Sequence, residues 1–108
     1  MKFGLPSQFL DLVISFGNTN PKVEQIILFG SRATGQYRNG SDIDLALLGK
    51  QLTIDDIIQF ERQLETLDIL NKFEVLIFDN ISSTELKEQI ITLGIELYSK
   101  TGHIIGVN

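Results

Sequence analysis

The segment of residues 26–49, IILFGSRATGQYRNGSDIDLALLG, constrains the fold of this chain more than any other. Its two apolar runs, 26–29 and 43–48, are separated by a Gly-Ser pair and a polar stretch, a pattern typical of two buried strands. Asp42 and Asp44 stand at the head of the second run, so on a strand both carboxylates point to one face. Because unpaired buried charge is costly, these two acids predict a bound cation.

The composition fits one domain and narrows the classes of function. The chain has 108 residues, 43% of them apolar, which is enough for one domain with a modest core and too few for two. A net charge of −5 disfavours a nucleic-acid surface, which would need clustered Lys and Arg. The sequence lacks a bilayer-spanning apolar run, a signal-peptide pattern and Cys, and we therefore expect a cytoplasmic protein without membrane contact.

Apolar periodicity and turn residues predict alternating helices and strands. In chain order these are a helix over 5–16, a strand over 23–29, a short helix over 31–37, a strand over 43–48, a helix from Thr53 to about 68–71, a strand over 73–78 and a helix ending near Gly94. Gly17 is expected to end the first helix, and Ser82 with Glu85 matches a capping box for the last. Residues 95–99 fit either a strand or a helix extension. This order predicts an α/β (α+β) sandwich with a small, largely three-stranded sheet.

Several further positions are candidates for ligand contacts. Gly30 lets the backbone approach a ligand closely, and Ser31 opens a helix whose free N–H groups attract phosphate. A plain turn and N-cap is the alternative for this pair, but the nearby acids favour phosphate binding. Arg32 is another candidate phosphate contact, with a solvent-facing or structural ion pair as its alternative. Ser41 is expected to hydrogen-bond near the Asp42 turn in a structural role.

One string of residues resembles a known signature. It consists of a Gly-Ser pair, ten residues and Asp-x-Asp, here Gly30, Ser31, Asp42 and Asp44. This resembles the signature of the nucleotidyltransferases of the polymerase-beta superfamily, and with Arg32 and Ser41 it most resembles the minimal nucleotidyltransferases of bacteria and archaea. The resemblance covers nearly the whole chain as a single minimal domain, 1–108. It implies a palm-like fold with a mixed sheet and helices packed against it.

The resemblance also implies a reaction, the transfer of AMP from ATP or another nucleoside triphosphate to a hydroxyl group. Such catalysis needs charge neutralisation and alignment, because the α-phosphorus is surrounded by anionic oxygens. Mg²⁺ takes one or two carboxylates plus phosphate oxygens, which suits Asp42 and Asp44 as catalytic metal ligands. Glu74, the only acid inside its apolar strand, matches the family's third carboxylate for a second metal, where the family more often has Asp. The alternative for Glu74 is a strand-edge residue that faces water.

The same resemblance implies a partner. Minimal nucleotidyltransferases often work with a helical protein of the HEPN type in a toxin–antitoxin pair, and a Tyr of that partner is a candidate acceptor. A homodimer is the other expected assembly, because a small palm exposes part of its surface. Two alternative functions stay open, an antitoxin-type subunit that acts by contact and a regulatory domain that binds nucleotide with little or no turnover. The apolar tail 101–108 is expected to pack or to be disordered, with an interface role as the alternative, and His103 within it receives no role.

Overall fold

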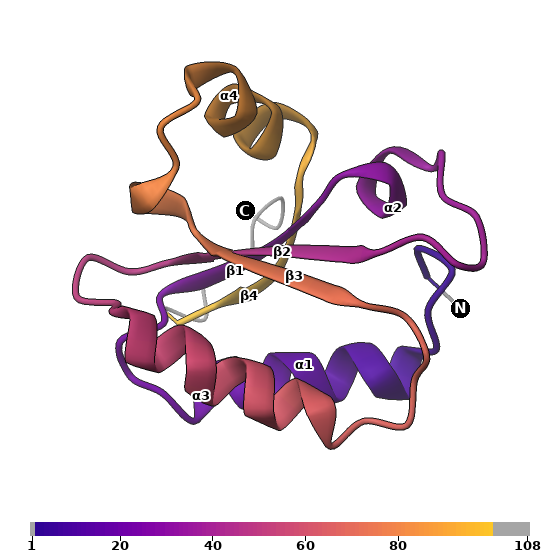
Figure 1. Cartoon of the computed structure of the whole chain (residues 1–108), viewed down its shortest axis with the longest axis horizontal. Coiled ribbons are helices and arrows are strands. Elements are labelled where there is room, and N and C mark those ends of the chain that lie inside the picture. Colours follow the sequence, from indigo (N-terminus) through magenta and orange to yellow (C-terminus); the bar gives the residue numbers. More distant parts are fainter. Residues whose placement is uncertain (1, 101–108) are drawn as a thin grey trace.

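A computed structural model describes residues 2–100 of the chain, and Figure 1 shows its arrangement. The helices and strands, in chain order, are α1 (Ser7–Asn18), β1 (Gln25–Phe29), α2 (Ser31–Thr34), β2 (Ile43–Leu48), α3 (Ile54–Glu65), β3 (Phe73–Ile77), the 3₁₀ turn η1 (Phe78–Asn80), α4 (Thr84–Leu93) and β4 (Ile95–Ser99). None of the helices within residues 2–100 combines the length and apolarity that a bilayer crossing requires.

The strands form one mixed sheet in the order β3-β2-β1-β4. Strand β1 pairs antiparallel with both β2 and β4, whereas β2 and β3 run parallel. The predicted α+β architecture with a mixed sheet is therefore confirmed. The expected strand count is corrected, because residues 95–99 form a fourth strand on the free edge of β1 instead of extending the preceding helix.

The two faces of the sheet are covered differently. Helices α1 and α3 lie side by side across one face, and α4 covers part of the other (Figure 1). Alternate strand residues follow this division, so that Ile26 and Leu28 join the core under α1 and α3 while Ile27 and Phe29 pack with Ile90 of α4. The apolar cluster that Ile27 and Phe29 form with Ile90 does not extend to the first residues of β2 and β3. Polar side chains there remain accessible to a ligand.

Several helix boundaries differ from the predicted ones for local reasons. Gly17 lies inside α1, where a Cβ would come within 2.5 Å of Ile26 Cδ1, so this glycine allows close packing on β1 and does not end the helix. The N-cap of α4 is Ser83, whose Oγ accepts a hydrogen bond from the Leu86 amide, and the predicted capping box at Ser82 is wrong. Gly94 is the C-cap of α4, as predicted.

The N-terminus of α3 is fixed by a buried carboxylate. Asp56 accepts a hydrogen bond from the Thr53 amide at 2.7 Å, which is one half of a capping box, and another from the Thr53 hydroxyl at 3.0 Å. Its carboxylate also lies 2.9 Å from Lys22 Nζ and accepts a bond from Asn20 Nδ2 at 3.0 Å. The ion pair with Lys22, together with these hydrogen bonds, holds the pKa of Asp56 well below its ordinary value. The same residue therefore joins α3 to the segment between α1 and β1.

Candidate active site at the heads of β2 and β3

Three carboxylates lie at one corner of the sheet, where the parallel strands β2 and β3 begin. Asp44 is directly opposite Glu74 in the register of the pair, so both side chains point to the α4 face. Asp42 comes two residues before Asp44, immediately ahead of β2. Asp44 is half-buried, whereas Asp42 and Glu74 are exposed. The structure thus places the three acids that the sequence singled out at one corner of the sheet.

The electrostatics of this corner favour a cation. Burial raises the pKa of Asp44 above its ordinary value, and the nearby carboxylates of Glu74 and Asp42 raise it further. Each of these causes makes the ionised form of Asp44 costly in the protein alone. A positive charge bound at this corner would remove that cost, because it attracts all three carboxylates at once.

Gly30 is built against the central acid of the group. It has φ of 79° and ψ of −155°, a conformation that is accessible essentially only to glycine. A Cβ at this position would fall on Asp44 Oδ2. The absence of a side chain at Gly30 therefore lets the turn after β1 lie directly against the Asp44 carboxylate.

Ser31 follows at the first position of the four-residue helix α2, which is shorter than predicted because Gly35 adopts a left-handed conformation and ends it. The side chain of Ser31 is half-buried. Within residues 2–100, its hydroxyl has no hydrogen-bond partner and is available to a ligand. This geometry is compatible with the predicted phosphate contact.

Arg32, the other candidate phosphate contact, is buried beside the same turn. Its side chain is only 2% exposed, and its guanidinium lies 5.0 Å from the centre of the Tyr37 ring. The hydrogen bonds of the guanidinium go to main-chain carbonyls, those of Phe3, Arg38, Asn39 and Ser41. A buried, hydrogen-bonded guanidinium is held where it is, so Arg32 supports the main chain around it, and its phosphate contact stays a prediction.

The loop that leads into Asp42 has its own internal bonds. The Arg38 amide donates to Ser41 Oγ at 2.8 Å, and the Ser41 amide donates to the Arg38 carbonyl at 3.0 Å. These bonds confirm the structural role predicted for Ser41. Asn71, which the sequence analysis missed, donates from Nδ2 to the carbonyls of Asn39 and Ser41 at 2.9 and 3.0 Å. An Asn in a loop before a strand is so common that nothing in the sequence marked this one.

The donor set can be compared with the needs of Mg²⁺. Carboxylate oxygens are the protein ligands that this ion prefers, and it commonly uses only one or two of them. Within the described part of the chain, no three acidic, His or Cys side chains converge into a ready metal-binding group. The corner nevertheless suits an ion that completes its shell with phosphate oxygens and water. Asp44 pairs with Glu74, and Asp42 lies near them. The turn at Gly30, which we call the cradle, lies directly against the Asp44 carboxylate.

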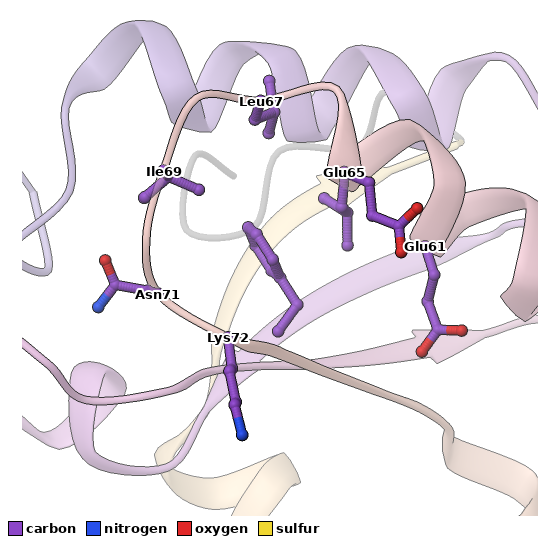
Figure 2. Close-up of a pocket in the computed structure, with 8 residues that line it drawn as sticks. Glu61, Glu65, Leu67, Ile69, Asn71 and Lys72 are labelled. Atoms are coloured by element: carbon purple, nitrogen blue, oxygen red, sulfur yellow. The ribbon is translucent and has the colours of Figure 1, made fainter.

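A pocket of about 460 Å³ lies between the end of α3 and the start of β3 (Figure 2). Its lining consists of Glu61, Leu64, Glu65, Leu67, Ile69, Asn71, Lys72 and Phe73. Leu64 and Phe73 belong to the core under α1 and α3. Because Glu74 follows Phe73 on the strand, it points to the opposite face. The pocket is therefore separate from the carboxylate corner.

Comparison with known proteins agrees with this geometry. Residues 12–103 match the family described as "Polymerase beta, Nucleotidyltransferase". Over 78 residues the chain is 35% identical to the protein adenylyltransferase MntA of Shewanella oneidensis. The matched region covers 72% of this chain and 55% of MntA. The chain therefore spans about half the length of this curated relative.

Solved structures show the same fold. A chain of a toxin–antitoxin complex with AMP-PNP matches with a TM-score of 0.69 and 28% identity, over 83% of this chain and 73% of that chain. A complex of a tri-AMPylated Shewanella oneidensis HEPN toxin with its MNT antitoxin matches with a TM-score of 0.64 and 23% identity, over 88% and 73% of the two chains, and supports the fold alone. This chain belongs to the polymerase beta nucleotidyltransferase family and, within it, to the minimal nucleotidyltransferases.

Proposed function

We propose that this protein is a Mg²⁺-dependent nucleotidyltransferase that moves AMP from ATP to a hydroxyl group of a protein. The observation that carries the proposal is the register of β2 and β3, which sets Asp44 beside Glu74, with the Asp42 charge near Asp44. Asp42 and Asp44 hold the metal and Glu74 supplies the third carboxylate of a two-metal site. Bound Mg²⁺ supplies charge neutralisation at the triphosphate and lowers the pKa of the attacking hydroxyl.

The remaining steps fall to the residues around this corner. The turn at Gly30 brings main-chain N–H groups and the Ser31 hydroxyl toward the triphosphate, and so orients the α-phosphorus. The acceptor hydroxyl loses its proton to water, its oxygen attacks that phosphorus, the bond to the bridging oxygen breaks, and pyrophosphate leaves. The choice of adenine rests on two relatives, an enzyme named as an adenylyltransferase and a complex that holds AMP-PNP.

The proposed acceptor is a Tyr of a HEPN-type helical partner. The family resemblance suggests such a partner, and a chain that is 28% identical to this one is part of a toxin–antitoxin complex with AMP-PNP. The net charge of −5 favours a protein acceptor over a nucleic acid, since a phosphate backbone would be repelled. A cytoplasmic setting, where ATP is available, is part of the same proposal.

Transfer from ATP labelled at the α-phosphate tests this function. The purified protein is incubated with Mg²⁺ and with a HEPN-type protein sought among the proteins encoded beside it, and label on the partner is measured. We expect labelling by the wild-type chain, none by Asp42→Ala or Asp44→Ala, and normal labelling by Asp79→Ala, which alters an exposed acid in η1. Undiminished labelling by either site variant would contradict the metal assignment.

The second candidate function is a binding subunit that neutralises a toxic partner by contact alone. The exposure of Asp42 and Glu74 at the protein surface is equally compatible with a recognition role. The Asp42→Ala, Asp44→Ala double variant separates the two functions. Full neutralisation of the partner by this variant would favour binding, and loss of neutralisation with retained binding would favour transfer.

A further inference from the structure

The loop of residues 38–41, which leads into Asp42, is held from two sides at the same two carbonyls. From one side, Arg32 Nη2 donates to the Asn39 and Ser41 carbonyls at 3.3 and 3.1 Å. From the other side, Asn71 Nδ2 donates to the same carbonyls at 2.9 and 3.0 Å. One donor belongs to α2 and the other to the loop before β3, so two separate elements fix the residue directly before Asp42.

The backbone beyond Asp42 is tied to the same loop. The Ile43 amide donates to the Lys72 carbonyl at 2.8 Å, the first hydrogen bond along the parallel pair of β2 and β3. Asn71 and Lys72 therefore hold the residues on either side of Asp42. They also precede Glu74 by only a few residues. The separation between Asp42 and Glu74 is thus set by this short stretch.

We infer that Asn71 is a positioning residue, which fixes Asp42 relative to Asp44 and Glu74 through the carbonyls of Asn39 and Ser41. The inference rests on the proposed function for its catalytic meaning, but the geometry stands by itself. Asn71 touches no reacting atom and acts through the loop. Figure 2 shows its side chain pointing out of the loop and away from Leu67. Its amide group is therefore free to reach the 38–41 loop.

An amide is well suited to this position, because Nδ2 carries two hydrogens and can serve two carbonyl acceptors. Asn71→Asp keeps the shape of the side chain but replaces the donor with a carboxylate oxygen that faces the two carbonyls. The loop must then move away from Asn71. Asn80→Asp is the matched control, since Asn80 is an exposed residue in η1, beyond the opposite end of β3, and undergoes the same change of charge.

The test measures the Mg²⁺ concentration that gives half-maximal ATP binding, by calorimetry, in the wild type, Asn71→Asp and Asn80→Asp. Residues that orient metal ligands typically contribute tenfold to a hundredfold to metal affinity. We expect Asn71→Asp to need on the order of tenfold more Mg²⁺ while it stays folded at the assay temperature, and Asn80→Asp to match the wild type. A Mg²⁺ requirement within about twofold of the wild type in Asn71→Asp would overturn the inference.

Amide hydrogen exchange of Asp42 and Ile43 gives a second readout that needs neither nucleotide nor metal. We expect exchange at both amides to rise on the order of tenfold in Asn71→Asp, because the loop that anchors them is released. Unchanged exchange would overturn the positioning role even if ATP binding were altered. If the wild type binds no ATP, the proposed function fails while exchange still decides the role of Asn71. If Asn71→Asp does not fold, Asn71→Ala is measured in the same two ways.

Discussion

Asp44 ionises at a cost, because it is half-buried and faces the carboxylates of Glu74 and Asp42. We expect Asp44→Asn to reduce nucleotidyl transfer on the order of a thousandfold, since it removes a charged ligand at the centre of the site. The same substitution should leave the stability of the metal-free protein unchanged within about 0.5 kcal/mol, or raise it, because it removes repulsion. Transfer of label from ATP checks the first point and thermal unfolding of the metal-free protein checks the second, with Asp79→Asn as the control.

The raised pKa of Asp44 also gives a pH dependence. Its folded state binds a proton at a higher pH than its unfolded state, so the metal-free protein loses stability as pH rises through the folded pKa. Metal binding competes with this proton. Mg²⁺ affinity should therefore weaken, as pH falls, at a higher pH than for an ordinary carboxylate of pKa about 3.9. An affinity that is flat down to that pH would contradict the assignment of Asp44.

Gly30→Ala tests the cradle beside Asp44. The new Cβ would fall on Asp44 Oδ2, and the backbone conformation would cost about 1–3 kcal/mol for a residue with a side chain. We expect a lower thermal midpoint, by roughly 4–8 °C for each kcal/mol, together with weaker Mg²⁺-dependent ATP binding. Gly40→Ala is the control, because a Cβ at Gly40 meets nothing within 4 Å. Equal behaviour of the two variants would refute the proposed cradle.

At the residue scale, the sequence placed the acids where the structure has them, and it did not reveal that the arginine is buried. Asp42, Asp44 and Glu74 could be found because strand periodicity fixes which side chains share a face. Arg32 could not be placed, because a buried brace and a phosphate contact both call for a guanidinium next to a turn. Only the positions of the carbonyls around it, those of Phe3 and Ser41 among them, distinguish the two roles.

At the scale of the elements, the N-terminus of α3 depends on Asp56. Asp56→Ala removes the capping box and leaves Lys22 without its ion pair, so the free energy of unfolding should fall by about 2 kcal/mol. Chemical denaturation at neutral pH measures this change. The control is Asp55→Ala, which alters an exposed acid in the same turn. Equal effects of the two substitutions would show that Asp56 stabilises α3 only through the helix dipole.

The lowered pKa of Asp56 sets the sign of its pH dependence. Its contribution is complete above the unfolded carboxylate pKa of about 3.9 and is lost as pH falls toward the lower folded value. The difference in stability between the wild type and Asp56→Asn should therefore shrink in acid. This trend is opposite to that of Asp44, and a difference that grows in acid would contradict the ion pair with Lys22.

Most elements were predictable, and their limits less so. The strand over residues 43–48 was predicted to the residue because polar and turn residues bound it on both sides. Helix α1 continues past Gly17, because this glycine is needed for close packing against Ile26. Nothing in the neighbouring sequence distinguishes such a glycine from one that ends a helix. Strand β4 forms because residues 95–99 pair with the free edge of β1. This pairing joins residues far apart in the sequence, so local periodicity cannot predict it.

At the scale of the whole molecule, helix and strand order predicted the fold class but not the order of strands in the sheet. The strand order β3-β2-β1-β4 brings the heads of β2 and β3 together, and the site exists because of it. Alternation of helices and strands fits several sheet topologies equally well. The family signature supplied what periodicity lacked, because it ties the Gly-Ser turn and the paired acids to one particular sheet.

Calorimetric titration of the purified protein with ATP, in the presence and absence of Mg²⁺, tests the central claim that the corner of β2 and β3 binds a metal–nucleotide complex. We predict binding that requires Mg²⁺ in the wild type and is lost in Asp42→Ala, while Asp79→Ala binds as the wild type does. The same binding in Asp42→Ala as in the wild type, or binding independent of Mg²⁺, would contradict the assignment of these carboxylates.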